Sequence, residues 1–198
     1  MKKNFSHFWL VNDVPQTNDD IPLVMTPNHM SWWDGFIIYC FLKLRTRRKF
    51  RIMMLEQQLL QFPFFSKLGA FSIDPGKPKS VHQTILYFHS LLKDSKNCIV
   101  FYPQGKMEPY WKRPQSIQAG LTHFLNSPVI SQVLPVASVI TTYNEKKPEI
   151  IVRFGEVISS KEIVADRELF IKKYHDNLLL CDAAINNRDF LLDFRLEL

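Results

Sequence analysis

The stretch that decides the fold reads Asn28-His29-Met30-Ser31-Trp32-Trp33-Asp34. It places an imidazole and a carboxylate where a short apolar run gives way to a helical pattern. Residues 21–25 have the apolar character of a covered strand, and Pro27 disfavours a direct passage into a helix. Ser31 and Asp34 form the Ser-x-x-Asp pattern of a capping box, so Ser31 is the predicted N-cap of a helix over residues 36–44.

His29 and Asp34 can meet only if the chain turns between them, because a five-residue step on an ideal helix separates two side chains by roughly 140°. With His29 in the loop and Asp34 in the first helical turn, the carboxylate reaches one ring nitrogen and fixes the tautomer. The other nitrogen can then take a proton from a hydroxyl or thiol, which is general-base catalysis worth about 10²–10⁴-fold. The alternative is that Asp34 only caps the helix and His29 is an ordinary loop histidine.

Composition favours an anionic partner. The 198 residues fit one domain over residues 1–198, and 25 basic against 19 acidic side chains give a net charge of +6. Sixteen Phe and four Trp accompany this charge, a combination that suits a membrane interface at least as well as nucleic acid. The chain has no helix-turn-helix, zinc-finger or aromatic RNP pattern, so no nucleic acid partner is expected.

The cysteines and the apolar runs indicate the compartment. Cys40, Cys98 and Cys181 are widely spaced and form no Cys-x-x-Cys pair, which is typical of a reduced cytosolic setting without a metal site. No apolar run approaches the roughly 18 residues of a spanning helix, and no signal-like apolar stretch follows Met1-Lys2-Lys3. We therefore expect a cytoplasmic protein that neither spans a membrane nor is exported by that route.

Two segments bear on membrane contact. Residues 43–51 carry six cations within nine positions, a density that predicts a solvated loop. This loop either has no function or is attracted to anionic lipid headgroups, at roughly 1 kcal/mol per cation. Near the N-terminus an apolar group either forms a small interfacial foot or packs on the core; it comprises Phe5, Phe8, Trp9 and Leu10.

The remaining pattern alternates strands and helices and predicts an α/β fold, a mostly parallel sheet flanked by helices on both faces. The predicted strands cover residues 52–55, 71–73, 98–102, 132–140 and 149–158, and the predicted helices cover 56–68, 81–92 and 163–196. Pro63 should break the first of these helices, and a break is expected at Asn186-Asn187 in the last. The apolar residues of 56–68 either belong to the core or receive an acyl chain.

Two strand-end loops are expected to converge on one crevice, because ligands bind at the carboxyl ends of the strands in open α/β sheets. One follows the short strand that holds Phe71 and Ile73, and the other is Pro103-Gln104-Gly105-Lys106. Gly105 permits a positive φ or a close backbone approach, and Lys106 offers a point charge for a phosphate.

Four segments together resemble the blocks of the glycerolipid acyltransferase family, the lysophosphatidate acyltransferase group, in order and spacing. The resemblance covers about residues 22–140 and leaves residues 141–198 to C-terminal strands and helices. The four segments are Asn28-His29-x-Ser31-x-x-Asp34, Gly69-x-Phe71-x-Ile73-Asp74, Phe101-Tyr102-Pro103-Gln104-Gly105 and Leu134-Pro135-Val136-Ala137.

The resemblance implies acyl transfer from acyl-CoA or acyl carrier protein to a hydroxyl of a lysophospholipid or related lipid. It assigns the base to His29 and its orientation to Asp34, on a protein attached peripherally to the inner face of an anionic membrane. No cofactor or metal is implied, since the thioester is already activated and preorganised donors, for example backbone amides near Gly105, can hold the oxyanion. The implied substrate-binding positions are Asn28, Ser31, Phe71, Ile73, Pro103, Gln104, Gly105 and Lys106.

Three departures, in two of the family blocks, concern the acceptor. The third block usually reads Phe-Pro-Glu-Gly-Thr-Arg, whereas Gln104 replaces the carboxylate and Met107 the arginine. Pro75 stands where the second block usually has an arginine, implicated in holding the acceptor's phosphate. Without these guanidinium forks the expected acceptor is a zwitterionic lysolipid, a glycosylated lipid or another lipid alcohol. The alternative function is a lipid-binding or scaffold protein that lost turnover, against which the intact His29–Asp34 pair argues.

Overall fold

The strand that leads into the His29 loop lies inside the sheet. In the computed structural model, which describes residues 3–193, β2 (Leu23–Pro27) is buried along its whole length. It pairs in parallel with β5 (Asn97–Val100) on one side and with β6 (Gln132–Thr141) on the other. A parallel strand covered on both faces needs the continuous apolar run that this segment has.

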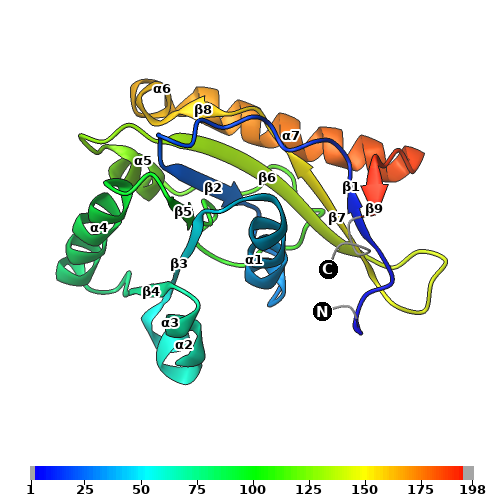
Figure 1. Ribbon diagram of the computed structural model, residues 1–198, viewed down its shortest axis with the longest axis horizontal. Coiled ribbons are helices and arrows are strands. Elements are labelled where there is room, and N and C mark those ends of the chain that lie inside the picture. Colours follow the sequence, from blue (N-terminus) through cyan, green and yellow to red (C-terminus); the bar gives the residue numbers. More distant parts are fainter. Residues whose placement is uncertain (1–2, 194–198) are drawn as a thin grey trace.

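The sheet continues outward on both sides in the order β4-β3-β5-β2-β6-β7-β1-β9, with β8 paired to β6 (Figure 1). Within residues 3–193, five of the eight strand pairings are parallel, which confirms the predicted mostly parallel sheet. The other strands are β1 (Phe8–Leu10), β3 (Lys49–Leu55), β4 (Ala70–Ile73), β7 (Glu149–Phe154), β8 (Ile158–Ser159) and β9 (Leu192–Asp193).

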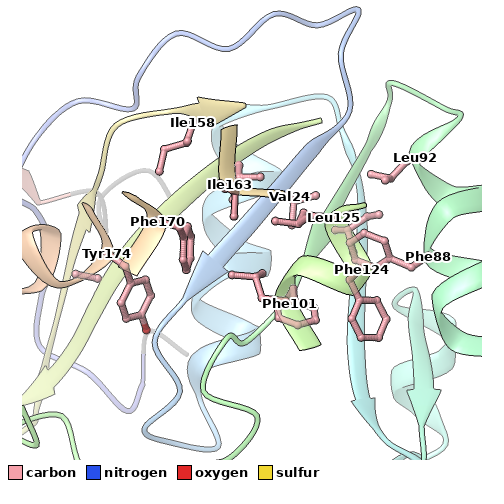
Figure 2. Close-up of a cluster of buried hydrophobic side chains, with 14 of the residues drawn as sticks. Val24, Phe88, Leu92, Phe101, Phe124, Leu125, Ile158, Ile163, Phe170 and Tyr174 are labelled. Atoms are coloured by element: carbon pink, nitrogen blue, oxygen red, sulfur yellow. The ribbon is translucent and has the colours of Figure 1, made fainter. Parts of the chain in front are cut away.

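Helices cover both faces of the sheet, as predicted. On one face α4 (Pro78–Leu92), α5 (Gly120–Leu125), α6 (Ser160–Ala165) and α7 (Arg167–Asn187) enclose a cluster that includes Val24 and Phe101 (Figure 2). On the other face α1 (Asp34–Arg45) packs with the N-terminal segment around Leu23 and Met25. Neighbouring strand residues thus point into different cores, which is the period-two alternation of a strand.

The N-terminal segment belongs to the core. Phe5, Phe8 and Leu10 are 1%, 0% and 2% exposed, and β1 adds a parallel strand beside β7. Of the two alternatives for this segment, packing on the core is therefore right and the interfacial foot is wrong. Among residues 3–193, no helix combines the length and the apolar character that crossing a bilayer requires.

The cationic segment 43–51 is not the solvated loop that its charge predicts. Its last part forms β3, which begins at Lys49. The Arg48 side chain is only 4% exposed, because its guanidinium donates hydrogen bonds to the carbonyls of Ile21, Ser95 and Asn18. Backbone carbonyls can thus bury one cation of the segment, an arrangement that charge density alone does not reveal.

Proline and capping residues determine where several helices end and begin. Pro63 separates α2 (Glu56–Gln61) from α3 (Phe64–Lys67), which confirms the predicted break. Ser159 and Glu162 form the capping box of α6, and Asp166 caps α7, which ends at Asn187. The end of α7 at Asn187 confirms the break predicted at Asn186-Asn187. The helix predicted beyond that break is wrong, because β9 follows there; residues 194–196 lie outside the described residues.

Candidate active site

Asp34 is the most constrained residue of the site. It occupies the first position of α1 and is completely buried. Its Oδ2 accepts hydrogen bonds from the backbone N–H groups of Met30 (2.7 Å) and Ser31 (2.9 Å), while its Oδ1 accepts from the Ser31 hydroxyl (2.7 Å). The start of the helix further favours its negative charge. The carboxylate is therefore held in one orientation.

The predicted contact between His29 and Asp34 is present. Nδ1 of His29 lies 2.8 Å from Oδ2 of Asp34, and the imidazole is 22% exposed. Asp34 has no proton to give when ionised, so Nδ1 is the donor and Nε2 is the nitrogen with a free lone pair. Among residues 3–193, no group forms a hydrogen bond with Nε2, so this nitrogen is available to a substrate.

The predicted cap is wrong in its detail. The residue before α1 is Trp33, and no side chain caps the helix; α1 begins at Asp34 rather than at residue 36. The Ser31 hydroxyl instead accepts from Trp33 N (3.1 Å) and donates to Asp34. Ser31 thus positions the carboxylate, and the Ser-x-x-Asp pattern has a different cause from the one predicted.

The ring of Tyr102 packs against the imidazole of His29, a contact that sequence reasoning missed. The two rings are stacked with centroids 4.1 Å apart and planes at 22°. Burial, and then the charge of Asp34, raise the pKa of the Tyr102 hydroxyl well above its ordinary value. Its hydroxyl is buried without a hydrogen-bond partner among residues 3–193. The position of Tyr102 just after β5 and directly before Pro103 is the only signal that the sequence carries.

Asn28 fixes the loop to the sheet. Its side chain is completely buried, Nδ2 donates to the carbonyl of Ser138 (2.9 Å), and Oδ1 accepts from Ser138 N (2.7 Å). Both halves of the amide are therefore used within the scaffold. Asn28, predicted as a substrate-binding residue, lies away from the crevice because it joins the His29 loop to β6.

The Pro103–Lys106 loop meets the His29 loop. Gln104 is completely buried, and its Oε1 accepts a hydrogen bond from the backbone N–H of His29. Gly105 adopts a φ of +68°, and a Cβ there would lie 2.9 Å from Cγ of Gln118. The glycine is thus required both by its backbone conformation and by its neighbour. Pro103 is buried and its carbonyl accepts from Gln118 N (2.8 Å), whereas Lys106 is exposed.

Replacing Gln104 separates its structural role from any role in acceptor choice. Gln104→Leu leaves the backbone N–H of His29 without a hydrogen-bond partner. We therefore expect a loss of about 1–3 kcal/mol in unfolding free energy and a lower rate of acyl transfer. Gln104→Glu keeps an oxygen that can accept the hydrogen bond from His29 N–H. This variant should retain activity, and its preference among acyl-acceptor lipids should be unchanged. Denaturant unfolding and transfer assays on both variants check this. Changed acceptor preference in Gln104→Glu would show that the amide contacts the substrate.

The second predicted strand-end position belongs to the core. Phe71 is 8% exposed and packs on Tyr87, with centroids 5.3 Å apart, and Ile73 packs on the same cluster. These two side chains, predicted to bind substrate, face the helix α4 side of the sheet instead of the His29 crevice. The reason is register, because β4 directs both alternate residues to that core.

A groove begins beside His29 at Met30. It has a volume of about 470 Å³. Its floor is tied to the site, since Glu108 N donates to the carbonyl of His29 (2.9 Å). Sequence reasoning did not find this groove, which the loop after Lys106 forms by folding back over β6. The lining residues are Met30, Met107, Glu108, Pro109, Tyr110, Trp111, Val139, Ile140 and Thr141.

Glu108 anchors that loop as a buried anion. Its carboxylate accepts hydrogen bonds from Lys112 and from the N–H (2.9 Å) and hydroxyl (2.8 Å) of Ser116. Burial raises the pKa of this carboxyl, but the hydrogen bonds from Lys112 and Ser116 outweigh it and lower the pKa to about 2.

This pKa predicts an acid-dependent contribution to stability. A folded-state pKa below the unfolded value means that Glu108 stabilises the fold at neutral pH and that this contribution is lost as the pH falls from about 4.5 to about 2. Glu108→Gln should therefore melt at a lower temperature than wild type near pH 7, and the difference should narrow in that acid window. Thermal unfolding across the pH range checks this; a difference independent of pH would contradict it.

Comparison with known proteins agrees with this geometry. A family model described as acyltransferase matches residues 10–136. The fold is similar to the crystal structure of the 1-acyl-sn-glycerophosphate (LPA) acyltransferase PlsC from Thermotoga maritima, with a TM-score of 0.58 and 13% identity over 92% of this chain and 73% of that chain. No curated protein matches the chain by sequence.

Proposed function

The chain belongs to the acyltransferase family, and from this premise we propose that it moves an acyl group from a thioester donor to a hydroxyl of a lysophospholipid or related lipid. The donor is acyl-CoA or acyl carrier protein. The observation that carries the proposal is the pair of His29 and Asp34, 2.8 Å apart, with Nε2 of the imidazole open to a substrate.

His29 acts as the general base in this proposal. Nε2 takes the proton of the acceptor hydroxyl as its oxygen attacks the thioester carbonyl, and Asp34 stabilises the imidazolium that forms. The tetrahedral intermediate then expels the thiolate, which receives that proton from His29. The bond to sulfur breaks, a new ester forms, and the imidazole returns to its neutral state, so no cofactor or metal is required.

The oxyanion of the intermediate needs donors that are not already engaged. The N–H of Gly105, the residue first expected near this role, donates to the carbonyl of Tyr102 (3.1 Å) and closes a turn. Among residues 3–193, the N–H groups of Lys106 and Met107 have no acceptor. These two amides are therefore the proposed donors in this loop.

The charges around the crevice support an acceptor without a phosphomonoester. Lys77 lies 2.7 Å from Asp74, which neutralises its charge, whereas Lys106 lies 3.7 Å from Glu108, a carboxylate that it shares with Lys112. The family's two arginine positions hold Pro75 and Met107. A phosphomonoester would find no bidentate partner at these positions. The proposed acceptor is accordingly a zwitterionic lysolipid, a glycosylated lipid or a lipid alcohol.

Such an acceptor resides in a bilayer, so the proposed location is the inner face of the cytoplasmic membrane, with the protein attached peripherally. The net charge of +6 supports attraction to anionic lipids. The wide spacing of the three cysteines suits a reduced compartment.

Thiol release from acyl-CoA tests the function. The purified protein is incubated with the donor and, in turn, lysophosphatidate, lysophosphatidylcholine, a glycolipid and a long-chain alcohol. We expect release that depends on the acceptor and is slowest with lysophosphatidate. Silence with every acceptor, and with acyl carrier protein as donor, at undiminished lipid binding would favour the lipid-binding scaffold, the alternative that Gln104 and Pro75 suggest.

A further inference from the structure

Large apolar side chains are exposed on the short helices α2 and α3, which project from one end of the molecule (Figure 1). Leu60 is 75% exposed and Phe64 45% exposed. Trp32, which is 45% exposed, contacts the half-buried Phe62 with ring centroids 4.8 Å apart, and Phe65 lies between Trp32 and Phe64. We call these four residues, Trp32, Leu60, Phe62 and Phe64, the aromatic patch. Clustered exposed apolar side chains of this kind mark an interaction site.

A basic cleft of about 370 Å³ adjoins the patch between α1 and α3. Lys67 at the end of α3 lines it together with Lys43 and Arg47 from the end of α1 and the segment after it. None of these three cations has a carboxylate partner among residues 3–193. The other two cations of the cleft are engaged, Arg48 by carbonyls and Lys49 by Asp94 (3.0 Å).

We propose that the aromatic patch and the basic cleft form one surface that docks on an anionic lipid bilayer. Aromatic side chains are enriched at the headgroup level of membranes, and cations near an anionic surface each contribute about 1 kcal/mol. The two features lie side by side, since α3 carries both Phe64 and Lys67. The inference rests on the proposed function in one respect: a lipid acceptor must pass from the bilayer to His29.

The docking surface lies near the His29 loop, which the lipid acceptor must reach from the bilayer. Trp32 follows His29 by three residues and contacts Phe65 of α3, with ring centroids 5.6 Å apart. Insertion of the patch into the headgroup region would therefore bring the loop that carries His29 close to the bilayer surface. The exposed apolar side chains of α7, Leu179 and Leu180, belong to a helix on the opposite face of the sheet from α1.

Charge argues for lipid instead of a second copy of the chain. A two-fold interface through this surface would set Lys43, Arg47 and Lys67 of one copy near the same cations of the other, and like charges across an interface are costly. An anionic bilayer supplies the complementary charge for the cleft and an apolar medium for the patch.

Vesicle co-sedimentation tests the surface without requiring catalysis. Wild type should bind vesicles that contain about one third phosphatidylglycerol at least 10-fold more tightly than pure phosphatidylcholine vesicles. The double variant Leu60→Ser/Phe64→Ser should lose at least 10-fold in affinity, and so should Lys43→Glu/Arg47→Glu. The matched controls are Leu179→Ser/Leu180→Ser on α7, where both residues are more than half exposed, and Lys161→Glu/Lys172→Glu, two exposed lysines.

The outcomes separate this surface from the proposed reaction. Unchanged binding by both patch and cleft variants, at wild-type melting temperatures, would overturn the proposal, and so would equal losses in the controls. Gel filtration that shows a dimer in wild type and a monomer in the patch variant would assign the surface to a second copy. If the protein binds vesicles through this surface but transfers no acyl group, the proposed function fails and the docking surface stands.

Discussion

His29→Ala is expected to lower kcat for acyl transfer by at least about 10²-fold, because it removes the imidazole Nε2 that takes the proton of the acceptor hydroxyl. The melting temperature should hardly change. The ring is partly exposed and has one hydrogen bond, to Asp34, and the backbone bonds that fix its loop remain. Thiol release at saturating acceptor measures kcat, and calorimetry measures the melting temperature.

The matched control is His82→Ala, which removes an exposed imidazole on α4. It should leave both quantities unchanged. A His29→Ala variant with full activity would end the mechanism, since the acceptor would then be activated by some other group. A folded His29→Ala variant with a large loss of kcat would support the proposed general-base mechanism.

Asp34→Asn is expected to damage activity and stability together. The carboxylate accepts hydrogen bonds from Met30 N, Ser31 N and Ser31 Oγ besides its contact with His29. The NH2 group of the asparagine amide cannot accept hydrogen bonds and would face some of these N–H and O–H donors. We therefore expect a loss of about 2–4 kcal/mol in unfolding free energy. Activity should fall by at least about 10²-fold, because the tautomer of His29 is no longer fixed.

Ser31→Ala is the graded control for this prediction. It removes only the hydroxyl that donates to Oδ1 of Asp34 and accepts from Trp33 N. Its losses should be smaller than those of Asp34→Asn in both activity and stability. If Asp34→Asn is less stable but fully active, Asp34 serves only the fold and the base does not depend on it.

The contact between His29 and Asp34 could be predicted from the sequence because its geometry is local. Pro27 ends the strand, the loop carries His29, and Asp34 stands five positions later, so the turn that joins strand and helix determines whether they meet. The parallel sheet and the break at Pro63 were predictable for the same reason, as each depends on short patterns. The start of the helix was not, because the hydrogen bonds of Ser31 and Asp34 close the turn before the helix, whose first residue is Asp34.

The rest of the site depends on contacts between distant parts of the chain. Gln104 bonds the backbone of His29, 75 positions away, and Asn28 bonds Ser138, 110 positions away. The family blocks indicated that these segments converge, but not which side chains face the crevice, so Asn28 and Gln104 were predicted as substrate contacts and are buried supports. Burial of Arg48 needs three carbonyls from two other segments, which no local pattern displays.

The proton positions on the His29 ring test the central claim most directly. Nitrogen NMR of the labelled protein, assigned by the signals lost in His29→Ala, distinguishes the two ring nitrogens. The account predicts a proton on Nδ1, bonded to Asp34, and a bare Nε2 at a pH where the protein transfers acyl groups. A neutral ring with its proton on Nε2, the nitrogen that must accept one, would contradict it.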